Sequence, residues 1–118
     1  PTPMMAAIRD NPDHTTWVVS TVGDMERLMV KNDKPMDLAP SQGCVLWLRM
    51  PETGQDYPLG QLPDRGGSAL LEVKPDLRPM VTKGELFVTM ESMADESADP
   101  MPAQPGGPPR FRGQWISL

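Results

Sequence analysis

The chain is 118 residues long, the size of one ordinary domain, and its formal net charge of −5 argues against binding to DNA or RNA, which needs a basic surface. The 15 prolines and 10 glycines argue against long helices and favour short strands joined by turns. The single cysteine excludes an internal disulfide and leaves the cellular compartment open.

The N-terminal segment, residues 1–13, is mixed in composition and contains three prolines. We predict an arm or linker here, with one short strand around residues 4–8. The chain starts at Pro1 without an initiator methionine, which is consistent with a fragment or a processed product that has lost a targeting or anchoring segment. None of its apolar runs approaches the length of about 20 residues that a membrane-spanning helix needs.

From His14 onward, apolar or alternating segments are separated by turn residues, which is the pattern of a β domain. Residues 44–50 are apolar at almost every position, so we expect this strand to be covered on both faces. Proline and glycine within residues 57–62 predict an edge strand or a bulge. The predicted strands are residues 15–19, 24–31, 44–50, 57–62, 68–74, 85–91 and 110–118.

Three further segments shape the prediction. Residues 24–31 fit either a short helix capped by Asp24 or a strand that turns Leu28 and Val30 inward. We favour the strand because both neighbouring segments are predicted strands. The sequence Asp-Arg-Gly-Gly at residues 64–67 predicts a tight turn that closes a hairpin. Residues 92–109 form a long acidic loop, and loops of this length are usually functional or mobile.

Together these elements predict an all-β fold. We expect a small antiparallel β-sandwich, Ig-like in size, of about seven strands with a long loop before the last strand; a small barrel also fits the pattern. The domain is predicted to cover residues 14–118. Within the strand at residues 85–91, we expect Leu86, Val88 and Met90 on the core side, with Glu85, Thr89 and Glu91 opposite.

The sequence lacks the spacing of a metal site. Zinc needs three or four protein ligands and blue copper needs two histidines, whereas His14 and Cys44 are the single histidine and cysteine. A cuprous site built from Met90, Met93 and Met101 is the alternative, but methionine more often fills gaps in a core. We therefore predict no metal and no cofactor.

Nucleophilic catalysis is not supported by the sequence either. A catalytic triad would depend on His14, and no serine lies in a nucleophile-elbow sequence. Cys44 is predicted to be a small buried hydrophobe, in surroundings that disfavour a thiolate. The carboxylates of Asp95, Glu96 and Asp99 lie in the long loop and lack the rigid placement that catalysis needs. We therefore predict no enzymatic activity.

The three tryptophans, Trp17, Trp47 and Trp115, fit either an exposed aromatic platform for sugars or a set of core residues. Tryptophans at alternating strand positions usually belong to a core, so we favour the core. The acidic loop fits a contact with a basic partner, although a simply solvated loop is the more common outcome.

Four segments form an ordered set along the chain. Residues 46–60 contain Leu-Trp-Leu and then Pro-Leu-Gly, residues 66–71 read Gly-Gly-Ser-Ala-Leu-Leu, residues 86–91 read Leu-Phe-Val-Thr-Met-Glu, and residues 111–115 read Phe-Arg-Gly-Gln-Trp. In this order they resemble the C-terminal domain of the RskA-type anti-sigma-K factor family over residues 14–118. The motif positions, for which we expect structural roles, are Trp47, Pro58, Leu59, Gly60, Val88, Thr89, Glu91 and Gly113.

The resemblance implies a protein with a cytoplasmic part that holds a sigma factor away from RNA polymerase, one membrane helix, and an extracytoplasmic (periplasmic) β domain. The present chain would be that outer domain, with residues 1–13 near the membrane exit. It would reach the sigma factor and the membrane only through parts that lie outside this chain. The resemblance also implies inactivation by stepwise proteolysis, and hence an envelope protease or a periplasmic partner.

The alternative function is a free-standing periplasmic or secreted β-sandwich module that binds a glycan or a protein. The sequence upstream of Pro1 discriminates between the two functions. An apolar stretch of about 20 residues after a small helical domain supports the anti-sigma factor. A cleavable signal peptide alone supports the binding module.

Overall fold

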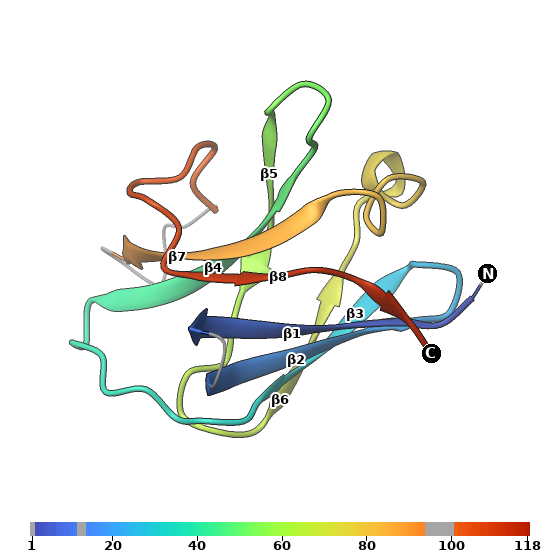
Figure 1. Ribbon diagram of the computed structural model, residues 1–118. Coiled ribbons are helices and arrows are strands. Elements are labelled where there is room, and N and C mark those ends of the chain that lie inside the picture. Colours follow the sequence, from blue (N-terminus) through green and yellow to red (C-terminus); the bar gives the residue numbers. More distant parts are fainter. Residues whose placement is uncertain (1, 12–13, 94–100) are drawn as a thin grey trace.

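The computed structural model describes residues 2–11, 14–93 and 101–118, and their regular secondary structure is almost entirely β-strand (Figure 1). The strands are β1 (Met4–Asn11), β2 (His14–Val22), β3 (Arg27–Asn32), β4 (Gln42–Arg49), β5 (Asp56–Gln61), β6 (Ser68–Glu72), β7 (Glu85–Ser92), β8 (Phe111–Gly113) and β9 (Ile116–Ser117). A 3₁₀ turn, η1 (Pro75–Leu77), lies between β6 and β7. Within these ranges, no helix has the length and hydropathy to cross a bilayer.

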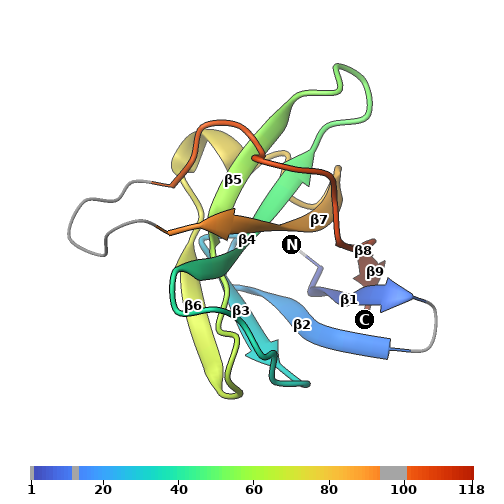
Figure 2. The same cartoon turned by 90° about the vertical axis from the view of Figure 1, so that its left-hand side faces the viewer.

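The strands form one antiparallel sheet in the order β5-β4-β7-β8-β1-β2-β3-β6, with β9 paired to β1. The sheet curls until its edge strands β5 and β6 touch, which gives a nearly closed barrel (Figure 2). The predicted all-β class is confirmed, with nine strands rather than about seven. The two layers expected of a sandwich are joined into one sheet because β8 pairs with both β7 and β1.

The inside of the curled sheet is filled by apolar side chains from alternate strand positions. Its largest fully buried side chains include Trp17, Ile8, Leu28, Leu46 and Leu48. The ring of Phe111 meets Trp17 edge to face, with the ring centroids 4.9 Å apart. In β4, residues 43–48 are all buried, so the prediction that both faces of this strand are covered is confirmed.

Residues 4–11 are a strand of the sheet, whereas the sequence placed them in an arm with one short strand. β1 pairs with β2 along one edge and with β8 and β9 along the other. Its Ala6 and Ile8 side chains are fully buried. The prolines that suggested a linker, Pro3 and Pro12, flank this strand in the sequence and remove none of its own amide donors. The sheet therefore begins before the predicted domain boundary.

The segment that fitted either a helix or a strand is a turn followed by β3. The turn covers residues 23–26, and Met25 within it has a φ of 66°. Leu28 and Val30 are fully buried, and they are two positions apart. The preference for a strand is confirmed, because buried residues two positions apart are typical of a strand.

The hairpin predicted at residues 64–67 is wrong. β5 pairs with β4 and β6 pairs with β3, so the strands that this turn connects are the two edges of the sheet and share no ladder. Asn32 fixes the turn, because its Oδ1 accepts the Gly66 N–H at 2.6 Å and its own N–H donates to the Gly67 carbonyl at 2.9 Å. Gly66 and Gly67 supply φ angles of 86° and 78°.

The last predicted strand is divided into β8 and β9, both of which lie along β1. Between them, the Trp115 indole N–H donates to the Val81 carbonyl at 2.8 Å while its ring packs against the core. The outward side chains Ile116 and Leu118 are 55% and 70% exposed. The C-terminal segment therefore covers the edge of β1 that β2 leaves open.

Candidate functional site

The outer face of β4 and β7 carries a second apolar cluster, separate from the core inside the sheet. This outer cluster consists of Val45, Trp47 and Phe87, with Met93 and Met101 packed against it. Trp47 is fully buried and Phe87 is 3% exposed. Their rings stack with an interplanar angle of 10° and a centroid distance of 6.2 Å. The outer face of β4 is therefore covered, as predicted, and the cover extends over Phe87 of β7.

A chain of hydrogen bonds runs beside the outer cluster. The Trp47 indole N–H donates to Thr89 Oγ1 at 2.8 Å, and the Thr89 hydroxyl donates to Glu91 Oε2 at 2.5 Å. The same Oε2 accepts the backbone N–H of Gly106 at 2.9 Å. Thr89 is fully buried and Glu91 is 8% exposed. Buried polar groups are costly unless they are paired, and each of these groups has a partner. We call this chain the latch.

The latch holds residues 101–110, which we call the strap. A Cβ atom on Gly106 would lie 2.5 Å from Glu91 Oε1, so any larger residue here would displace the Glu91 carboxyl group. The next residue, Gly107, has open space where a Cβ would lie. At its far end, the strap is fixed by the Arg110 N–H, which donates to the Val88 carbonyl at 2.8 Å. The strap then continues directly into β8.

The motif residues expected to be structural occupy several parts of the fold. Trp47, Thr89 and Glu91 form the latch. Val88 and Leu59 belong to the core inside the sheet. Pro58 pairs with Trp47 next to a register shift between β4 and β5. β5 is an edge strand, as the proline in this segment predicted.

The two motif glycines lie where neighbouring strands approach closely. Gly60 has a φ of 151°, and a Cβ there would be 2.9 Å from the Leu71 side chain of β6. This contact closes the seam between the two edge strands. A Cβ on Gly113 would lie 2.5 Å from the Ala7 carbonyl oxygen and 2.6 Å from Ile8 Cδ1. Glycine at this position therefore lets β8 dock on β1.

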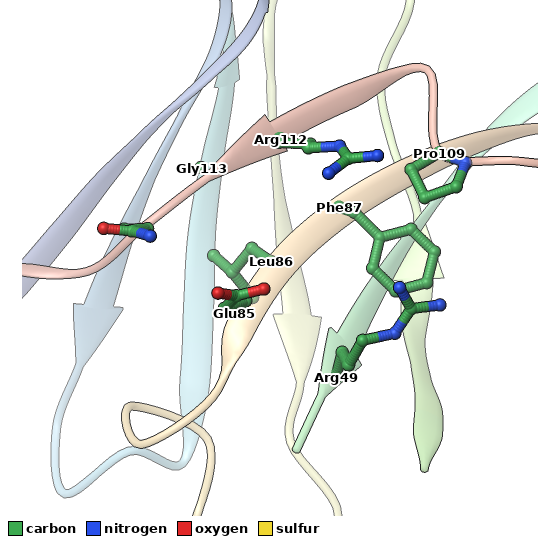
Figure 3. A pocket seen from close by; sticks show the side chains of 8 residues that line it. Arg49, Glu85, Leu86, Phe87, Pro109, Arg112 and Gly113 are labelled. Atoms are coloured by element: carbon green, nitrogen blue, oxygen red, sulfur yellow. The ribbon is translucent and has the colours of Figure 1, made fainter. Parts of the chain in front are cut away.

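A pocket of about 280 Å³ opens between β4, β7 and β8, next to the end of the strap (Figure 3). Arg49 and Arg112 line it, with Phe87 between their guanidinium groups in this view. Glu85 and Pro109 are also among its lining residues. The Arg49 guanidinium carbon lies 4.6 Å from the Phe87 ring centroid. The pocket thus combines an aromatic surface with two cationic groups.

Residues 1–109 match the family described as "Anti-sigma-K factor rskA, C-terminal". The chain belongs to this family. Searches of curated proteins and of solved structures gave no match. The match includes β1, which agrees with the position of that strand inside the sheet, and it ends before β8, so Gly113 lies beyond the matched residues.

The tryptophans of this anti-sigma-K factor C-terminal domain do not form a common exposed platform. Trp17 is fully buried inside the sheet, and its indole N–H donates to the Pro63 carbonyl at 2.6 Å. Trp47 lies on the opposite face, in the outer cluster. Trp115 is partly buried against the core inside the sheet. The core interpretation is confirmed for Trp17 and Trp47.

Cys44 and His14 lie in different surroundings. Cys44 is fully buried, and its Sγ lies 3.8 Å from Met36 Sδ. The pKa of the Cys44 thiol is raised to about 11, mainly by burial and to a lesser extent by Asp64, with Arg110 opposing the shift. His14 Nδ1 lies 3.8 Å from Asp10 Oδ1, on the exposed start of β2. The prediction that Cys44 is a small buried hydrophobe is confirmed.

The three methionines weighed as copper ligands are divided between two faces of the sheet. Met90 packs against the core inside, whereas Met93 and Met101 pack against the outer cluster. In the described ranges, no group of three or more His, Cys, Asp and Glu residues is placed to hold a metal ion. The loop carboxylates Asp95, Glu96 and Asp99 lie outside the described residues.

Proposed function

We propose that this domain is the extracytoplasmic regulatory domain of a single-pass membrane anti-sigma factor that antagonises an ECF-type sigma factor. The sigma factor would bind to a cytoplasmic part, and a transmembrane helix would precede residue 1; both lie outside this chain. The folded domain would shield the protein from an envelope protease until a signal arrives. Membership of the anti-sigma-K factor family is the observation that carries this proposal.

The position of β1 supports a shielding role. β1 is the strand closest to the proposed membrane helix, and it is paired on both edges, with Met4 opposite Ser117 and Arg9 opposite Arg112 on the C-terminal side. Proteases cleave extended, unpaired segments, so a strand inside a sheet must first open locally. Freeing β1 from this side requires the C-terminal segment to leave.

The latch gives this segment a point of control. The strap, held by the contact between Glu91 and Gly106, leads directly into β8, and β8 and β9 lie along β1. Release of the strap would remove one attachment of the C-terminal segment. In this mechanism a signal acts on the strap, β8 and β9 separate from β1, and the N-terminal segment becomes a protease substrate.

Limited proteolysis of a matched glycine pair tests this mechanism. Gly106→Ala places a Cβ against the Glu91 carboxyl group and should speed the first cuts several-fold, with cut sites in residues 101–118 and then 1–13. Gly107→Ala adds the same methyl group to open space and should be cut like the wild type. First cuts inside β2 or β4, with the N-terminal residues intact, would contradict the mechanism.

The same pair tests the function in cells. In the full-length protein, Gly106→Ala should raise transcription from a sigma-dependent reporter, and deletion of the envelope protease should abolish the increase. Equal reporter activity for the Gly106 and Gly107 variants would count against control by the strap. The sequence upstream of residue 1 separates this proposal from a free-standing periplasmic or secreted module, which would follow a cleavable signal peptide and no membrane helix.

A further inference from the structure

The pocket between β4, β7 and β8 contains one guanidinium group that is already fixed in place. Arg49 Nε donates to Asp56 Oδ1 at 2.7 Å, and Nη2 donates to Oδ2 at 2.9 Å. The same group lies over the Phe87 ring, so both its position and its plane are defined. Two of its five N–H donors are used by Asp56, which leaves the others available to a ligand.

Among the residues that the structure describes, the second guanidinium group has no acidic partner. Arg112 stands directly opposite Arg9 on β1 and opposite Phe87 on β7. Like charges placed opposite each other on neighbouring strands are destabilising. Arg9 Nε donates to Thr15 Oγ1 at 3.3 Å, whereas the Arg112 side chain has no hydrogen bond or ion pair within the described part of the chain. Arg112 and Arg9 are thus two cations placed opposite each other, although the chain carries a net charge of −5.

The remaining lining residues restrict which ligand could pair with Arg112. The volume of about 280 Å³ suits a single side chain or a small acid rather than a polymer segment. Phe87 and Pro109 offer an apolar surface beside the guanidinium groups. Glu85 on the rim disfavours a ligand with several negative charges, because it would repel the second one.

We propose that this pocket binds a carboxylate attached to a compact apolar or aromatic group. The carboxylate accepts a bidentate pair of hydrogen bonds from Arg112, and the positive charge of Arg49 adds to the attraction. The apolar group packs on Phe87 and Pro109. The carboxylate can come from a free small acid or from the C-terminus of a polypeptide, since the two share this chemistry. The inference does not rest on the proposed regulatory function.

Titration of the ¹⁵N-labelled domain with matched acids and amides tests the site. N-acetyl-phenylalanine should shift the backbone signals of the pocket strands and the Nε–H signal of Arg112, and its neutral amide should bind at least tenfold more weakly. A tetrapeptide that ends in phenylalanine, with a free or an amidated C-terminus, forms the second arm. Binding should weaken as salt is raised, because the attraction is electrostatic.

Three variants identify the residue responsible. Arg112→Gln should weaken binding of the acid by tenfold or more, and Arg112→Lys should fall between this variant and the wild type because it keeps the charge but loses the planar fork. Arg65→Gln, which changes an exposed arginine in a distant turn, should bind like the wild type. The urea midpoint of Arg112→Gln should equal or exceed that of the wild type, since the substitution removes a like-charge pair.

The two arms of the titration distinguish the source of the carboxylate. Tighter binding of the peptide acid indicates a polypeptide C-terminus, and tighter binding of the free amino-acid derivative indicates a small acid. Failure of both acids to bind, equal binding of an acid and its amide, shifts outside the pocket, or unchanged affinity of Arg112→Gln would each overturn the proposal.

Discussion

The two faces of β4 and β7 are both largely buried but are constructed differently. On the inner face, Leu46, Leu48 and Val88 belong to an apolar core that strands from the whole curled sheet enclose. On the outer face, Trp47 and Phe87 are covered by loop residues, and polar groups lie among them. Opening the inner face requires the barrel to come apart, whereas opening the outer face requires the strap and the Met93 side chain to leave.

This difference predicts two levels of stability in one small domain. Segments that are held by few apolar contacts open at lower free energy than the core strands. The strap is attached through the latch and through the bond between Arg110 and Val88, so we expect it to open first. Substitutions on the inner face should lower the stability of the whole domain, and substitutions in the latch should act mainly on the strap.

The largest effect is expected for Ile8→Ala on the inner face. Ile8 is fully buried, and deletion of its side chain should lower the free energy of unfolding by about 2–5 kcal/mol. Ile116→Ala removes the same atoms from a residue that is 55% exposed and should cost less than about 0.5 kcal/mol. Urea unfolding measures both variants. Similar midpoints for the two would mean that β1 is not part of the core.

The next largest effect is expected for Gly113→Ala, at the contact between β8 and β1. The added Cβ would meet the Ala7 carbonyl oxygen at 2.5 Å, and this atom belongs to a paired strand that cannot move freely. Overpacking of this kind costs about 1–3 kcal/mol. Hydrogen exchange should show faster opening at β8 and β9 and unchanged protection in β4. If the variant exchanged its β8 amide protons at the wild-type rate, the added methyl group would have been accommodated without loosening β8.

The sequence predicted the inner face well and the outer face only in part, because it indicated that both faces of β4 are covered but not which residues cover the outer one. Period-two alternation identified Leu28 and Val30 as core residues, because a strand buried on one side has this pattern. Prolines misplaced the start of the sheet, since the rule that proline breaks a strand cannot distinguish a proline inside an element from one just outside it. The glycine turn at residues 64–67 predicted a change of direction correctly and the strand pairing wrongly, because pairing depends on the closure of the sheet.

The latch was not predicted because its members have the usual pattern of a solvated face. Thr89 and Glu91 alternate with core residues along β7, and polar residues at such positions normally meet water. Glu91 is held by Gly106 of the strap, which follows it by 15 positions in a segment without periodicity. The residues nonetheless belong to the motif that resembled the family, so the sequence identified these positions without the contacts that explain them.

A smaller effect is expected for Thr89→Val, which keeps the shape of the side chain and removes the hydroxyl group. The buried Trp47 N–H and the Glu91 carboxyl group each lose a partner, and an unsatisfied buried group costs about 1–3 kcal/mol. Loss of the strap relieves much of this cost by admitting water, so global stability should fall by less than for Ile8→Ala. The tryptophan emission maximum should shift to longer wavelength as Trp47 becomes exposed to solvent.

Thr89→Ser is the matched control for this substitution, because it retains the hydroxyl group. It should keep the wild-type fluorescence and the slow exchange of the Gly106 amide proton. If Thr89→Val left both signals unchanged, the hydroxyl group would not be what connects the indole to the strap.

The smallest effect at neutral pH concerns Cys44, which lies on the inner face and reports on it independently of the latch. Burial raises the pKa of its thiol from 9.0 to about 11, so the folded state keeps a proton that the unfolded state releases. The resulting stabilisation is complete below pH 9 and is lost as the pH rises through 11. Cys44→Ala should remove this alkaline loss of stability without changing the slope at lower pH.

Alkylation of the Cys44 thiol at pH 8 requires that the thiol be exposed and deprotonated. Its rate therefore measures how often the inner face opens, and a comparison of variants shows whether the outer face opens with it. The rate should rise in Ile8→Ala, where the barrel opens more often, and should match the wild type in Thr89→Val, where only the strap is loosened. Faster labelling in both variants would mean that the strap and the barrel open together. The two faces of β4 would then form one cooperative unit, and a signal at the strap would have to unfold the domain to free β1.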